Sequence, residues 1–188
     1  MDQVTDDELM LMFRQGDVEA FDVLFDRHYR SVYNYARSLL GDCHGAEDML
    51  QETFLTVARA GARYEPRGHF RTWLMRICRN GCLNLLQRER LRRGAVVTSD
   101  PELAAVASDQ PSPPEVVQEE ERMTRLRLAV ARLPERQREA IALYAFEQMG
   151  YREISEVLEA PLGTVKTLIH RARSALAQEL ERIEGAAR

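Results

Sequence analysis

The 188-residue sequence has little of what several protein classes require. It contains three cysteines (Cys43, Cys78 and Cys82), an odd number without metal-type pairs, so neither a disulfide framework nor a zinc module is indicated. No apolar run approaches the roughly 18 residues needed to cross a bilayer, and the segment that begins at Met1 lacks a basic-then-apolar signal. We therefore expect a soluble, cytoplasmic protein with no direct membrane insertion.

Patterns that carry enzyme chemistry are missing too. The sequence holds no Ser-His-Asp arrangement, no glycine-rich phosphate loop and no HExxH motif, so we expect neither enzyme activity nor a cofactor. No window alternates apolar and polar residues between turn pairs, so strands are not expected. What is present is helical periodicity in a chain with 45% hydrophobic and 30% charged residues, which predicts a folded, all-α protein.

Charge is segregated along the chain, although the net charge is only −4. Residues 1–52 hold 4 Arg against 12 acidic residues, whereas residues 53–94 hold 10 Arg against 2. Residues 95–121 hold 7 acidic residues and no basic one, and residues 122–188 hold 12 basic against 9 acidic. Local charge sets the field that a partner meets, so the second and fourth blocks are candidates to bind phosphates. Lys166 is the single lysine among 26 basic residues, and arginine's planar donors suit phosphates and guanine edges.

Four helices are predicted in residues 1–93, which we assign to an N-terminal domain. Thr5 and Glu8 have the form of a capping box that starts a short helix, which stops near Gly16. Asp17 can cap a second helix that ends at Gly41. Apolar residues spaced by three and four predict a third helix around residues 49–58 and a fourth around residues 70–86. The matching apolar stripes predict one helical bundle.

The remaining chain divides into a linker and a second helical domain. Residues 94–121 contain four prolines, few large apolar residues and only negative charges, which predicts a flexible acidic linker. Helical periodicity resumes over residues 122–188. Within them, a short helix from Tyr151, a turn at Glu159 and Ala160, and a second helix that begins at Pro161 form a helix-turn-helix.

The second helix of this motif has a basic and polar outer face. It carries Lys166, Thr167, His170, Arg171 and Arg173. Such a face is typical of a recognition helix that enters the major groove of DNA. The alternative interpretation is a solvated amphipathic helix with incidental charges.

The sequence resembles the extracytoplasmic-function (group IV) sigma factors of bacterial RNA polymerase. The resemblance covers nearly the whole chain and rests on five stretches: AFDVLFDRHY from Ala20, AEDMLQETF from Ala46, FRTWLMRICRN from Phe70, LPERQREAIAL from Leu133 and PLGTVKTLIHRAR from Pro161. It implies a sigma factor that binds core RNA polymerase and promoter DNA and directs promoter recognition, DNA melting and transcription initiation. Such proteins are commonly held inactive by an anti-sigma protein, which is therefore a further expected partner.

The resemblance also implies three sets of binding residues. The helix that docks on the polymerase clamp would use Glu47, Asp48, Gln51 and Glu52. The loop 60–69 would pocket a flipped base of the minus-ten element, and the following helix would track the single strand with Arg76, Arg79, Asn80, Asn84 and Arg88. The minus-thirty-five element would be met by Lys166, Thr167, His170, Arg171 and Arg173.

Other interpretations of the whole chain and of the acidic helix stay open. A free-standing helix-turn-helix regulator with a helical sensor or dimerisation domain would share the C-terminal pattern without needing polymerase. Metal-ligating groups occur close together at Asp42, His44, Glu47 and Asp48. Neighbouring residues on a helix point about 100° apart, so we expect no metal site. The same carboxylates are also compatible with a plain solvated face.

Interpretations of the sulfur and aromatic residues of the fourth helix are also open. Cys78 and Cys82 lie one turn apart on its apolar side and are expected in the core rather than in a redox or zinc switch with Cys43. Trp73 is a candidate to help separate the two DNA strands, but its spacing with Phe70 favours packing in the protein core.

Four positions depart from the family pattern. Glu159 stands where glycine is frequent in the helix-helix turn, and it bears strain if its φ is positive. In the family, alanine is frequent at the position of Ser155, a polar or basic residue at that of Leu168, and aspartate at that of Asn84. These departures concern the promoter sequence rather than the family.

Overall fold

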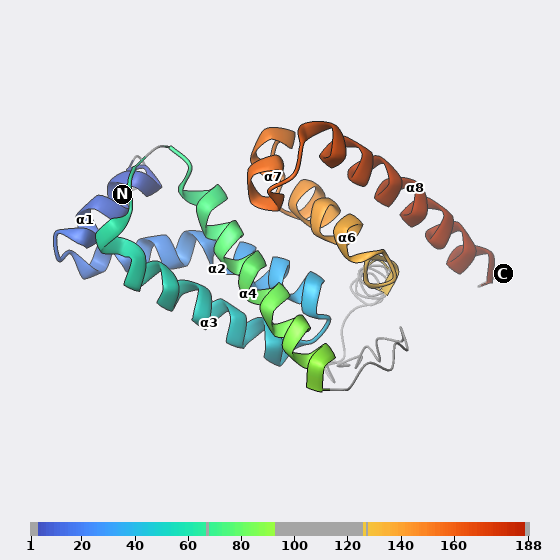
Figure 1. Cartoon of the computed structure of the whole chain (residues 1–188), viewed down its shortest axis with the longest axis horizontal. Coiled ribbons are helices and arrows are strands. Elements are labelled where there is room, and N and C mark those ends of the chain that lie inside the picture. The colour runs from blue at the N-terminus through green and yellow to red at the C-terminus, as the bar shows by residue number, and fades with distance from the viewer. Residues whose placement is uncertain (1–3, 67, 93–125, 127, 187–188) are drawn as a thin grey trace, which may run out of the picture.

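The computed structural model describes residues 4–66, 68–92, 126 and 128–186 (Figure 1). The segment 94–121, which the sequence predicts to be the linker, lies outside them. The described residues form helices joined by short turns, with no strand among them, which confirms the predicted all-α class. Within the same residues, no helix is both long enough and apolar enough to span a membrane.

The N-terminal domain contains four α-helices and a short 3-10 turn, Gly61–Arg63. The helices are α1 (Asp6–Arg14), α2 (Val18–Leu40), α3 (Cys43–Ala60) and α4 (Phe70–Arg92). The predicted capping box is present, because Thr5 accepts from the Glu8 backbone and Glu8 accepts from the Thr5 backbone. The Asp17 side chain caps α2, and Gly41 ends this helix with a left-handed φ of 85°. Local chemistry therefore sets these helix boundaries.

Apolar side chains of all four helices fill the bundle core. Tyr35 of α2, Phe54 of α3 and Leu74 of α4 are all buried there. Cys78 and Cys82 are fully buried, which confirms the predicted core position. Trp73 is half-buried and packs on Tyr64, with the ring centroids 4.9 Å apart.

The C-terminal domain holds the predicted helix-turn-helix. Its elements are α6 (Glu135–Ile141), a π-helical turn (Ala142–Phe146), α7 (Tyr151–Leu158) and α8 (Leu162–Ala186). Glu159 has φ 50° and ψ 47°, so a non-glycine residue does occupy the left-handed region in the turn. The Pro161 carbonyl accepts the first backbone bonds of α8, which begins one residue later than predicted. Burial of Ile154, Val157, Val165 and Ile169 holds the two helices together.

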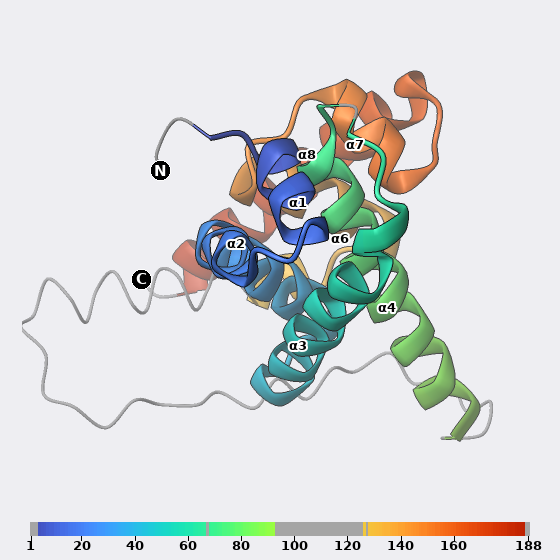
Figure 2. The same cartoon turned by 90° about the vertical axis from the view of Figure 1, so that its left-hand side faces the viewer.

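The two domains pack against each other. Helix α4 contacts α7, and α2 contacts α6 and the π-helical turn. Buried residues of both domains form one continuous apolar cluster. Figures 1 and 2 show α4 between α3 on one side and the C-terminal helices on the other. The sequence predicted two domains on a tether and gave no sign of this contact.

Candidate nucleic-acid interface

Helix α8 presents the predicted basic and polar face to solvent. Its inward side is fixed by three buried residues, Val165, Ile169 and Ala172. The five side chains predicted to meet DNA are all exposed: Lys166, Thr167, His170, Arg171 and Arg173. The Thr167 hydroxyl donates to the Gly163 carbonyl at 2.9 Å, which orients this side chain along the first turn of α8. The N-terminal half of α8 therefore offers donors and a fixed backbone to a groove.

A second exposed face lies along α4. Arg76, Asn80, Asn84 and Arg88 are all exposed. Residues four apart on a helix lie on one side, so these four form a continuous stripe, which we call the α4 stripe. Arginine attracts phosphate, and asparagine offers both a donor and an acceptor to a base edge. The stripe has the chemistry needed to follow a nucleic-acid strand.

Arg79, the fifth residue predicted on this helix, lies elsewhere. Its side chain is 6% exposed, and its Nε donates to Glu139 Oε2 of the C-terminal domain at 2.5 Å. Its Nη1 also donates to Asn80 Oδ1 at 3.3 Å, next to the stripe. The guanidinium is therefore occupied in this conformation, and its role in binding DNA stays a prediction.

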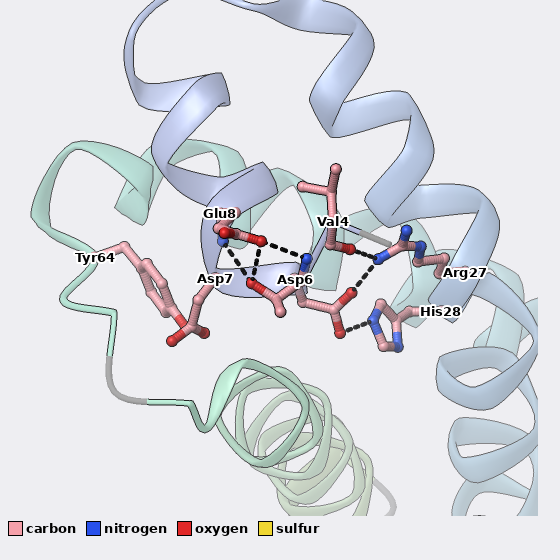
Figure 3. Close-up of polar contacts among 8 residues, drawn as sticks. Val4, Asp6, Asp7, Glu8, Arg27, His28 and Tyr64 are labelled. Carbon is pink, nitrogen blue, oxygen red and sulfur yellow. Dashed lines mark hydrogen bonds and ion pairs between the residues drawn. The ribbon is translucent and has the colours of Figure 1, made fainter. Parts of the chain in front are cut away.

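Asp7 of α1 holds the loop before α4 at two points. Asp7 accepts a hydrogen bond from the Tyr64 hydroxyl at 2.6 Å and from the Gly68 backbone N–H at 2.5 Å. Gly68 has φ 71°, a conformation that glycine adopts without strain. Burial and the Asp7 carboxylate raise the pKa of the Tyr64 phenol, so it remains a donor. Figure 3 shows Tyr64 and Asp7 side by side.

The neighbouring Asp6 ties α1 to α2 (Figure 3). Asp6 accepts from Arg27 at 3.0 Å and lies 2.7 Å from His28 Nε2. Burial alone would raise the pKa of Asp6, but hydrogen bonds and charge from His28 and Arg27 outweigh it and lower this pKa below 3.8. The first turn of α1 thus positions both α2 and the loop, a role that the sequence did not reveal because the partners are far apart in the chain.

The predicted polymerase-docking residues form an exposed acidic face on α3. The four residues Glu47, Asp48, Gln51 and Glu52 are all exposed. His44 lies 4.0 Å from Glu47, and Arg59 lies 3.8 Å from Glu52.

Leu55 adds a feature that the sequence reading missed. Its side chain is 49% exposed, one turn beyond Gln51 and Glu52, and so places an apolar group beside the acids. The sequence could have indicated this exposure, because Leu55 does not fall on the apolar stripe of α3. A protein partner that offers cations around an apolar patch would fit this face.

Within the described part of the chain, no three His, Cys, Asp or Glu side chains converge to hold a metal ion. The candidate ligand His44 is 98% exposed, and its Nδ1 lies 4.0 Å from Glu47 Oε2.

Family models match both domains. The Sigma-70 region 2 model matches residues 24–92, and the Sigma-70 region 4 model matches residues 123–176. The first match spans α2 to α4 with the α4 stripe, and the second spans the helix-turn-helix.

Full-length comparisons agree with these matches. The ECF RNA polymerase sigma factor SigE of Mycolicibacterium smegmatis is 35% identical over 162 residues, which cover 86% of this chain and 62% of that protein. The RNA polymerase sigma-H factor of Pseudomonas aeruginosa is 30% identical over 184 residues, which cover 95% of each chain. The ECF RNA polymerase sigma factor SigW of Bacillus subtilis is 30% identical over 172 residues, which cover 89% of this chain and 92% of that protein.

Two solved structures share the fold. CnrH, in complex with the cytosolic domain of CnrY, superposes with a TM-score of 0.71 at 25% identity, covering 94% of this chain and 97% of that chain. The sigma factor RpoE of Bartonella quintana, in complex with the anti-sigma factor NepR, also gives 0.71 at 21% identity, covering 86% and 96%.

Proposed function

This chain belongs to the extracytoplasmic-function sigma factors, and we propose that it directs core RNA polymerase to promoters by binding alone, through three separate surfaces. It acts in the cytoplasm, where the polymerase is, and it contributes no chemistry of its own. The observation that carries this proposal is the presence of two exposed faces of basic and polar side chains, the α4 stripe and the first turns of α8, on different domains of one chain.

Each domain takes one promoter element. Residues 1–93 bind the minus-ten element, with the loop 60–69 receiving a flipped base and the α4 stripe following the strand. Residues 122–188 bind the minus-thirty-five element through the α8 face, and residues 94–121 join the two. Phosphate contacts give affinity, and side chains at base edges give sequence preference.

The acidic face of α3 binds the polymerase. Carboxylates that crowd one helix repel one another until a cationic partner compensates them, so docking to basic residues of the clamp releases that repulsion. The exposed Leu55 supplies apolar area at the edge of this contact.

An anti-sigma protein is a further proposed partner. The support is the RpoE–NepR complex, whose sigma factor shares this fold, together with the family to which the chain belongs.

In-vitro transcription with purified core polymerase and a promoter library tests the proposal. We expect initiation that depends on both this protein and core. Absence of core-dependent initiation at every promoter would reject the proposal, and DNA binding that needs no core would then favour a free-standing regulator.

A charge-reversal variant tests the docking face by co-purification with core polymerase. The triple substitution Glu47→Lys, Asp48→Lys and Glu52→Lys should abolish co-purification with core and leave helicity intact. The matched control reverses three exposed acids on α2: Glu19, Asp22 and Asp26. Retention of core binding by the first variant, or equal loss in both, would refute docking through α3.

A further inference from the structure

Helix α1 contacts both the side chain and the backbone of Tyr64, in the loop before α4. The Asp7 carboxylate accepts from the Tyr64 hydroxyl at 2.6 Å, and Arg14 Nη1 donates to the Tyr64 backbone carbonyl at 3.4 Å. Tyr64 is only 8% exposed, and its ring packs against Trp73 and Phe70 of α4, with centroid distances of 4.9 and 5.9 Å. This residue of the loop is therefore held by α1 at its polar groups and by α4 at its ring.

The second oxygen of the Asp7 carboxylate holds the loop at Gly68. Asp7 Oδ1 accepts from Tyr64, while Oδ2 accepts from the Gly68 backbone N–H at 2.5 Å. A Cβ placed on Gly68 would meet no atom within 4 Å, so this position requires glycine for its φ of 71° and not for lack of room. One carboxylate thus fixes two points of the loop and stabilises the bend between them.

Helix α1 lies outside the segment that matches the family model. The Sigma-70 region 2 model covers residues 24–92, which include the loop and α4 but not Asp7. The neighbouring Asp6 fastens α1 to α2, because it accepts from Arg27 at 3.0 Å and lies 2.7 Å from His28 Nε2 (Figure 3). Two adjacent carboxylates therefore have separate tasks: Asp6 holds α1 in place, and Asp7 holds the loop.

A loop that receives a base selects among bases better when its shape is fixed before the base arrives. A flexible loop adapts to several bases, and each adaptation costs ordering entropy that lowers affinity. A loop held at both Tyr64 and Gly68 keeps one shape, so a base that does not match it leaves polar groups unpaired. Loss of the Asp7 contacts would therefore weaken base discrimination at the loop, while phosphate contacts along the α4 stripe would remain.

We propose that Asp7 of α1 is a positioning residue for base selection, which fixes the loop in the shape that receives the flipped base of the minus-ten element. Asp7 acts through Tyr64 and Gly68 rather than by contact with DNA. The proposal rests on the proposed function, which assigns the flipped base to this loop. It adds a determinant of promoter specificity that lies outside the segment matched by the family model.

Base preference measured position by position tests the proposal. Fluorescence anisotropy gives the affinity of holoenzyme, reconstituted from core polymerase and each variant, for the preferred promoter of the library and for its single-base variants. Asp7→Ala should reduce the ratio between the best and the worst base by at least about fivefold at one minus-ten position, the lower end of what one base contact contributes. The ratios at the minus-thirty-five positions should not change, because α8 makes no contact with Asp7.

Three further variants separate positioning from a general loss of stability. In Asp7→Asn the amide oxygen accepts from Gly68 while the amide nitrogen donates to the Tyr64 hydroxyl oxygen, so wild-type base ratios should return. Asp6→Ala is the matched control, because it removes the adjacent carboxylate, which contacts α2 and not the loop. It should lower Tm and leave the base ratios unchanged. Tyr64→Phe keeps the ring packing and removes one contact, so it should lower the ratio at the same position even if Asp7→Ala does not fold.

The outcomes separate this proposal from the sigma function. Unchanged base ratios in folded Asp7→Ala, or in Tyr64→Phe where Asp7→Ala does not fold, would overturn the positioning role. An equal fall in Asp6→Ala, or no recovery in Asp7→Asn, would overturn it as well. Failure of the sigma function would appear already in wild type, as absence of core-dependent initiation, whereas failure of the positioning role alone leaves wild-type initiation intact and appears only in the variants.

Discussion

The backbone strain in the turn of the helix-turn-helix can be tested by substitution at Glu159. Glu159 holds φ 50° and ψ 47° with an exposed side chain. A residue with a Cβ costs roughly 1–2 kcal/mol in this left-handed region, and glycine avoids that cost. Glycine also loosens the unfolded chain by about 0.4–1 kcal/mol. Glu159→Gly should therefore stabilise the protein by about 0.5–1 kcal/mol net.

Thermal unfolding followed by far-ultraviolet circular dichroism measures this gain. For a chain of this size, about 1 kcal/mol shifts Tm by roughly 2–4 °C, so we expect a rise of about 1–4 °C. Glu159→Ala is the matched control, because it removes the same side chain and keeps the Cβ. Its Tm should not rise.

Two results would refute the reasoning. A lower Tm for Glu159→Gly would mean that the turn is not strained in the native protein. An equal rise for Glu159→Ala would mean that the side chain, rather than the backbone, destabilises the turn.

Three further predictions concern the promoter faces and α1. Arg171→Ala should weaken binding to the preferred promoter by about 1–3 kcal/mol and flatten base preference at one or two adjacent positions. Arg173→Ala should instead lower binding to all single-base promoter variants alike. Equal, sequence-blind losses from both substitutions would refute the assignment. Asp6→Asn should lower stability by about 1 kcal/mol at pH 7. Because the folded pKa of Asp6 lies below 3.8, this contribution is present above that pH and lost as pH falls, so urea denaturation curves of wild type and variant should converge in acid; a difference that persists in acid would contradict it. Asp7→Ala should speed hydrogen exchange at the Gly68 amide without changing exchange in α2, and unchanged exchange at Gly68 would contradict the anchor.

Helix boundaries were predictable because their signals are local. Thr5 with Glu8, Asp17 and Gly41 marked ends that the structure places within a residue or two. Each signal acts within three or four residues, through a side chain that satisfies a free backbone group or a glycine that takes a left-handed φ. The outward face of α8 was predictable for a similar reason, since helical spacing alone separates Val165 and Ile169 from the exposed residues.

Long-range polar contacts were not predictable in this way. Tyr64 and Asp7 are 57 residues apart, and nothing in either neighbourhood indicates that one phenol will meet one carboxylate. Asp7 lies in the first turn of α1, where the helix dipole alone favours acidic residues. Only the packing of α1 against the loop adds its second role.

Arg79 shows where residue type and spacing stop being sufficient evidence for a DNA contact. It stands in a basic helix next to Arg76 and Asn80, and by those criteria alone it is equivalent to them. What separates it is Glu139, 60 residues later in the chain, which buries it and takes its Nε. A basic face attracts any carboxylate that the same chain can bring near, so its availability depends on the acids of the other domain as much as on its own arginines. Some of the arginines that give α4 its positive charge are therefore also the ones that pair with carboxylates of the C-terminal domain.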